Sequence, residues 1–161
     1  PSMLTITVDD RAFRDYLHQL SARASDLTEA MDSIGNVLET RVRQRFETKT
    51  DPNGQPWAPW KESTRASYPF AGAPAAAKEG PGKGLLLDRY GTMLDHLSYD
   101  ADTTSVRIGF AQPYAAYHEW GTSTMEQRGM LMSDPDAGTL GADDEAAVLD
   151  ILSAWLDDLA N

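Results

Sequence analysis

The feature that most constrains the fold is a long apolar stripe in the first third of the sequence. Between residues 27 and 46, apolar side chains recur at intervals of four, three, four, four and four positions. Residues with this spacing lie on one face of an α-helix, so the pattern predicts a long helix that buries one side. The stripe consists of Leu27, Met31, Ile34, Leu38, Val42 and Phe46. The rest of the fold must supply an apolar surface to cover it.

The ends of this helix are also indicated. Ser25, Asp26 and Glu29 are typical of an N-cap with a capping box, so the helix should begin directly after Asp26. Residues 51–56 combine Asp, Pro, Asn and Gly, which all favour turns, so the helix should end before them. Gly35 should weaken the helix locally.

A strand and another helix precede the stripe. Leu4, Ile6 and Val8 alternate with threonines, which predicts a half-buried strand over residues 3–8. An apolar face at helical spacing follows and predicts a first helix that pairs with the long one. That face consists of Phe13, Tyr16, Leu17 and Leu20.

The middle of the chain predicts a hairpin. Residues 94–99 and 105–110 flank a polar stretch, and Val106 and Ile108 point to one face of the second strand. A short helix over residues 86–93 should come before the hairpin.

The C-terminal part predicts two helices and a strand. Residues 114–120 are expected to form a short helix that Gly121 ends. Residues 130–132 are a candidate strand. Asp143, Asp144 and Glu145 place negative charge where a helix dipole favours it. The buried face of this last helix is predicted to be Val148, Leu152, Trp155 and Leu159.

These elements predict an α+β fold. We expect a small antiparallel sheet packed by the N-terminal helix pair and the C-terminal helix. The length of 161 residues, with 41% apolar residues, fits a single domain over residues 1–161. Residues 68–84 are mostly Ala, Gly and Pro and bury little apolar area, so we predict a long mobile loop there.

The charge argues against a nucleic-acid-binding surface. Acidic residues outnumber basic ones by 25 to 14, for a formal net charge of -11. Gripping nucleic acid requires a basic patch. Arg41, Arg43 and Arg45, near Lys49, form the one basic cluster, but their spacing of two spreads them around a helix. A solvated helix face is therefore the favoured interpretation of this cluster.

Composition also limits the chemistry and the location. With no cysteine, the chain can form neither a disulfide nor a thiolate nucleophile nor a cysteine zinc site. No apolar run is long enough to span a bilayer. We expect a soluble protein without membrane contact, found in the cytoplasm of the cell that makes it.

Motifs of cofactor and metal sites are incomplete. The glycine-rich residues 80–84 lack a P-loop, because Ala77 replaces the first glycine and Gly84 the hydroxyl residue. His118 and Glu119 resemble the start of a zincin helix, but Thr122 stands where the second histidine is required.

A calcium loop is similarly incomplete. Asp134, Asp136 and Glu145 have the spacing of ligands, but Thr139 stands where the loop needs glycine. We therefore expect no cofactor, no metal and no catalytic residue.

The tryptophans allow two interpretations. Trp155 lies in a helical stripe and is expected in the core. Trp57, Trp60 and Trp120 lie in or beside loops, where they either pack locally or anchor a partner.

Several segments in order resemble the phage virion morphogenesis family, the tail-completion proteins of Mu-like and P2-like phages. The segments are Phe46 followed by residues 51–59 (DPNGQPWAP), residues 86–94 (LLDRYGTML), residues 106–109 (VRIG) and residues 113–122 (PYAAYHEWGT). The resemblance extends over most of the chain after residue 27.

The resemblance implies a structural virion protein and not an enzyme. It implies a neck component that forms a ring, most plausibly a hexamer, between the tail tube or tail terminator protein and the head–tail connector. The partner-interface candidates on this basis are Trp57, Pro59, Trp60, Tyr68, Phe70, Tyr114, Tyr117, His118, Trp120 and Arg128.

The acidity fits such a ring. Six copies at -11 each carry a formal charge of -66, and a negative channel wall repels passing DNA without binding it. Three alternatives stay open: a head-side connector or tail-terminator protein, a small hydrolase of morphogenesis, and a host-directed binding module that would be monomeric and absent from virions.

Overall fold

The computed structural model describes residues 4–9, 26–58 and 92–160. The predicted first helix, the predicted loop over residues 68–84 and most of the predicted helix over residues 86–93 lie outside these ranges. The described elements are, in chain order, β1 (Leu4–Asp9), α2 (Thr28–Thr48), α5 (Thr92–Asp95), β2 (Leu97–Ala101), β3 (Ser105–Phe110), α6 (Ala115–Trp120) and α7 (Ala142–Ala160).

The three strands form an antiparallel sheet in the order β1-β3-β2. Ile108 in the central strand is opposite Ile6 on one side and Tyr99 on the other. The predicted hairpin is confirmed, with its first strand beginning at Leu97. Its turn is fixed by Asp102, whose Oδ1 accepts hydrogen bonds from the backbone amides of Thr104 (2.9 Å) and Ser105 (2.8 Å).

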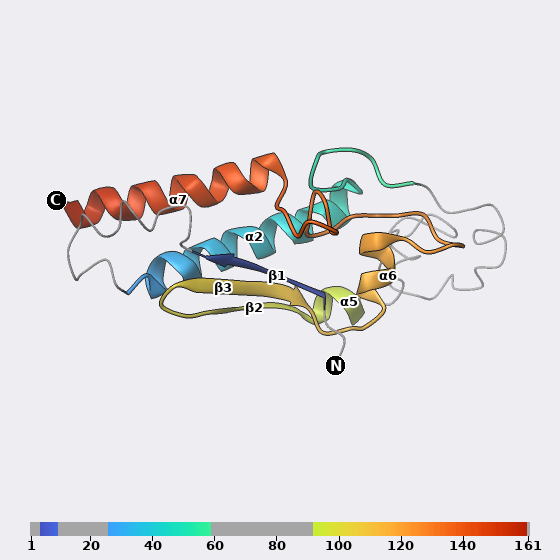
Figure 1. Cartoon of the computed structure of the whole chain (residues 1–161), viewed down its shortest axis with the longest axis horizontal. Coiled ribbons are helices and arrows are strands. Elements are labelled where there is room, and N and C mark those ends of the chain that lie inside the picture. Colours follow the sequence, from blue (N-terminus) through green and yellow to red (C-terminus); the bar gives the residue numbers. More distant parts are fainter. Residues whose placement is uncertain (1–3, 10–25, 59–91, 161) are drawn as a thin grey trace.

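Helix α2 covers one face of this sheet, and the predicted stripe is confirmed (Figure 1). All six of its residues are at most 2% exposed. They pack on the inward side chains of the strands, among them Ile6, Val106 and Ile108. Burial of this apolar area is the main stabilising contribution to the contact.

Gly35 has a packing role beyond the predicted weakening of α2. A Cβ added there would lie 2.3 Å from Cδ2 of Tyr99 in β2. The Tyr99 hydroxyl donates a hydrogen bond to Asp32, one turn earlier on α2, at 3.1 Å. The glycine therefore allows the helix to approach the sheet closely at β2.

The helix ends differ in detail from the prediction. The N-cap position falls on Leu27, which forms no side-chain cap. Instead of a capping box, Asp26 accepts a hydrogen bond from the Thr28 amide at 3.0 Å. At the C-terminus Lys49 adopts the left-handed conformation, and the predicted turn over residues 51–56 follows. Its Asp51 Oδ1 accepts two amide hydrogen bonds.

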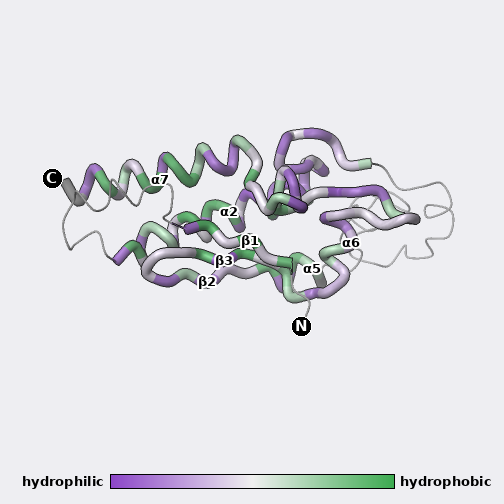
Figure 2. The backbone as a smooth tube through the Cα atoms, in the orientation of Figure 1, coloured by the Kyte–Doolittle hydropathy of each residue, from purple (hydrophilic) through white to green (hydrophobic). Residues whose placement is uncertain are grey.

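Helix α7 forms a third layer on the side of α2 that faces away from the sheet (Figure 1). Apolar and polar stretches alternate along it (Figure 2). Val148 and Leu152 are buried as predicted, and so is Leu156. Trp155 is only partly buried against the core, so its predicted place on the buried face is occupied by Leu156. The side chain of Leu159 is outside the described set.

The α+β class is confirmed by this arrangement of a small antiparallel sheet with helices packed against it. In the view of Figure 1, helices α5 and α6 lie near the end of the sheet that is farther from the C-terminus. That end carries most of the described candidate contact residues.

Candidate functional site: an aromatic surface supported by buried polar groups

The inner face of α6 anchors this short helix. Ala115 and Glu119, one turn apart, are both fully buried. Gly121 ends the helix with a φ of 75°, and its amide donates to the Tyr117 carbonyl at 2.9 Å. A residue with a side chain would be strained in this conformation, so the predicted termination at Gly121 has a clear cause.

The outer face of α6 exposes three aromatic side chains, which we call the aromatic row. Tyr114, directly before the helix, is 39% exposed, Tyr117 is 56% exposed and Trp120 is 44% exposed. Tyr117 is three residues from each of the other two, so neighbouring members of the row lie close together on the helix surface. Among the described residues the fourth large exposed apolar side chain is Leu149 on α7. The exposed aromatic side chains of the described residues are thus those of α6 and of the residue directly before it.

The carboxylate of Glu119 holds the chain that returns beneath α6. Glu119 is 0% exposed. Its Oε2 accepts the Met130 amide at 2.7 Å, and its Oε1 accepts the amides of Leu131 at 2.7 Å and Met132 at 3.0 Å. The predicted strand over residues 130–132 is therefore wrong: these amides bond to a side chain, not to a neighbouring strand.

The carbonyl groups of the same chain segment are also bound by side chains. The Trp57 indole donates to the Gly129 carbonyl at 2.8 Å, and the Arg45 guanidinium to the Met130 carbonyl at 2.7 Å. Arg128 donates from Nε to the Ala58 carbonyl at 2.8 Å. We call residues 128–132 the anchored segment. The backbone groups of Gly129 to Met132 named above find side-chain partners without regular secondary structure, as buried polar groups require.

A buried ion pair joins this region to α7. Arg45 (6% exposed) pairs with Asp144 (1% exposed), and the Arg41 Nε lies 2.6 Å from the other oxygen of the same carboxylate. The predicted solvated face is therefore wrong for Arg45, because α7 covers this side of α2. Arg43 remains exposed and pairs with Glu39 one turn away.

Burial changes the proton affinity of two α6 side chains. Burial raises the pKa of Glu119, while its three amide donors and Arg45 oppose the rise. Burial, reinforced by the nearby positive charge of Arg128, lowers the pKa of His118 to about 4. The buried Nδ1 of His118 has no hydrogen-bond partner among the described residues. His118 is therefore neutral at pH 7.

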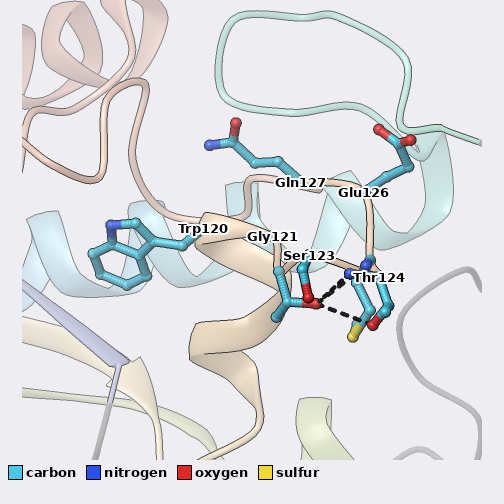
Figure 3. A pocket seen from close by; sticks show the side chains of 8 residues that line it. Trp120, Gly121, Ser123, Thr124, Glu126 and Gln127 are labelled. Carbon is cyan, nitrogen blue, oxygen red and sulfur yellow. Dashed lines mark hydrogen bonds between the residues drawn. The ribbon is translucent and has the colours of Figure 1, made fainter.

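The loop after α6 fixes the orientation of Trp120. Its indole Nε1 donates to Asp136 Oδ1 at 2.9 Å. Asp136 belongs to a tight turn in which Asp134 accepts the Asp136 amide at 3.0 Å. Residues 120–127 line a shallow polar pocket, and Trp120 projects away from Ser123 and Thr124 (Figure 3).

The residues predicted to contact a partner differ in how far the structure exposes them. Tyr114, Tyr117 and Trp120 are exposed together on α6. Trp57 adopts the packing role, since it is buried edge-on against Phe46 with ring centroids 5.4 Å apart. His118 is partly buried behind the aromatic row, and Arg128 is buried in the anchored segment. Four candidates lie outside the described residues: Pro59, Trp60, Tyr68 and Phe70.

Sequence reasoning missed the supporting groups Glu119, Arg45 and Asp144. The signal available was spacing: Glu119 lies one turn after Ala115, and Arg45 and Arg41 are one turn apart on α2. Such spacing cannot indicate which distant backbone groups a charged side chain will meet.

The described residues contain no group of three His, Asp or Glu side chains arranged to hold a metal ion. Nor is any described helix long and apolar enough to cross a membrane.

The comparisons with known proteins agree with the earlier resemblance. The model of the phage virion morphogenesis family matches residues 8–157. No curated protein and no solved structure matched the chain. Since the family match extends over nearly the whole sequence, the chain belongs to the phage virion morphogenesis family.

Proposed function

We propose that this chain is a structural tail-completion, or neck, protein that forms a ring and joins the tail to the head connector. Family membership supports a role in phage virion morphogenesis, and the position in the neck and the ring are our proposals. We further propose that the protein acts by binding other proteins and not as an enzyme.

The observation that supports this function best is the aromatic row on its rigid base. Tyr and Trp are enriched at protein interfaces, where they contribute large contact areas at low entropic cost. Because Glu119 fixes α6 to the anchored segment, the exposed rings are already held in position before a partner arrives. Such an arrangement suits a protein whose task is to make contacts.

The charge on α7 supports the proposal of a channel that DNA passes through. This helix carries six acidic residues and no Lys or Arg. Asp157 and Asp158 lie near its C-terminal end, where the helix dipole disfavours negative charge. If α7 faces the lumen of a ring, its exposed carboxylates repel the phosphate backbone and keep DNA from adhering.

The first experiment measures the mass of the purified protein by light scattering, alone and with the tail-tube protein of the same phage. We expect a discrete ring, with the mass of a hexamer, in at least one of these conditions. A monomer in both would contradict the ring.

A second experiment distinguishes the neck protein from a head-side connector. Phage grown without this protein should accumulate separate heads and tails, and the purified protein should bind the tails first. If it binds the heads first, the head-side alternative replaces the proposed one. Cleavage of peptide or glycan by the purified chain, lost in His118→Ala, would instead support the hydrolase alternative.

A further inference from the structure

The C-terminal part of the chain, which carries the aromatic row, is strongly acidic. Residues 111–161 contain ten acidic residues and a single basic one, Arg128. Arg128 is 8% exposed and its Nε is bonded to the Ala58 carbonyl. This part of the sequence therefore presents no exposed cation beside the aromatic row, whereas Glu126, Asp134 and Asp136 are all exposed near it in sequence.

Trp120 and Asp136 form a combination suited to a cation. The Asp136 carboxylate lies at the edge of the indole, bonded to Nε1 at 2.9 Å, so the ring is held in place while 44% of the residue stays exposed. The face of an indole attracts a guanidinium or ammonium group. An arginine stacked on this ring can also pair with the carboxylate at its edge.

We propose that the aromatic row is the docking surface for a different virion protein, one that inserts an arginine or lysine against Trp120 and Asp136. Charge complementarity favours a partner with a basic surface, because the exposed charged residues near the aromatic row in sequence, Glu126, Asp134 and Asp136, are all acidic. The inference rests on the proposed function and adds the chemistry of its partner.

Binding to particles that lack this protein tests the inference. Tails and heads are purified separately from phage grown without it, and the affinity of the purified protein is measured at about 50 and about 300 mM NaCl. Wild-type protein should bind one of the two particles and should bind more weakly at high salt. Trp120→Ala should weaken binding at least tenfold, because such anchors dominate interface energies.

Two further variants identify the chemistry. Asp136→Asn keeps an oxygen that can accept the indole hydrogen bond but removes the charge, so binding should weaken several-fold and lose part of its salt dependence. Leu149→Ala is the matched control, because it removes a large exposed apolar side chain outside the aromatic row, on α7. It should bind like wild type. Light scattering of each variant records self-association in parallel.

The outcomes separate the inference from the function on which it rests. If wild type binds and joins heads to tails but Trp120→Ala and Asp136→Asn behave identically to it, the docking surface is refuted and the proposed function stands. If Trp120→Ala loses self-association, the occupant is a second copy and the inference is wrong. If wild type binds neither particle, the proposed function itself fails.

Discussion

The contact of α2 with the sheet and the contact of α6 with the anchored segment both bury apolar side chains, but only the second depends on charged and polar side chains bonded to the backbone. In the first, a periodic apolar stripe packs on apolar strand residues. In the second, an irregular segment is held by the side chains of Glu119, Arg45 and Trp57, each bonded to its backbone. Apolar burial is tolerant of small shifts, whereas hydrogen bonds in a buried site require defined geometry.

This difference fits two separate roles of the two contacts in the proposed function. The α2–sheet contact supplies stability, and the polar contact fixes the position of the exposed aromatic row. Mutations in the first region should therefore mainly lower stability, and mutations in the second should also affect partner binding.

The largest loss of stability is expected in the apolar region. Phe46 is fully buried and contacts Trp57 and Phe110. Phe46→Ala should lower the free energy of unfolding by about 3–5 kcal/mol, because it removes buried area and leaves a cavity. Urea denaturation followed by circular dichroism measures the loss. A change below about 1 kcal/mol would mean that the core relaxes around the site.

The ion pair between α2 and α7 ranks next. Asp144→Asn removes the charge that compensates buried Arg45, so we expect a loss of about 3 kcal/mol. Hydrogen exchange should show faster opening of α7 than of the sheet. Asp143→Asn, at an exposed neighbouring position, is the control and should change stability by less than about 0.5 kcal/mol. Equal losses of stability from the two substitutions would contradict the role of Asp144 in a buried ion pair.

Glu119→Gln tests the anchored segment directly. The new amide group would present N–H donors to backbone amides that need an acceptor, so we expect a loss of about 1–3 kcal/mol. Partner binding should weaken as well, because the aromatic row loses its fixed base. The exchange rates of the amides of residues 130–132 are the sharpest measurement, and unchanged protection there would show that the carboxylate is dispensable.

The prediction with the smallest effect at neutral pH concerns His118. Its pKa of about 4 in the folded protein lies below the value of 6.5 for an unperturbed histidine. Between these values the unfolded chain binds the proton and the folded one does not. This contribution to stability is therefore complete above about pH 6.5 and is lost as the pH falls towards 4.

Comparison with His118→Gln isolates this contribution. The raised pKa of Glu119 acts in the opposite direction and is common to both proteins. Wild type should lose stability relative to the variant as the pH falls from 7 to 4. Parallel pH profiles would show that His118 titrates normally.

Most of the regular secondary structure could be predicted because it depends on local periodicity. The stripe of α2, the alternation in β1, the hairpin and the C-terminal helix each repeat with the period of one element. The end of α6 at Gly121 was likewise predictable, since a positive φ there favours glycine. Trp120 was predictable as a contact candidate because it lies beside a loop, and Tyr117 because it lies in a segment that resembles the family.

Other features depended on groups far apart in the chain. Glu119, Arg45 and Asp144 are charged residues at ordinary helical positions, and sequence alone favours solvent for such residues. Met130 to Met132 have the composition of a strand, yet no strand forms because a carboxylate binds their amides.

The α+β class and the α2 stripe could be predicted from the residue pattern alone, which also showed the family resemblance that the family match confirmed. Only the tertiary structure decided which charged residues are buried, that Trp57 packs inside while Trp120 stays exposed, and where the segment after α6 is anchored. The physical reason is that apolar periodicity is a local property of one helix or strand, whereas a buried charge is stable only where specific distant partners meet it.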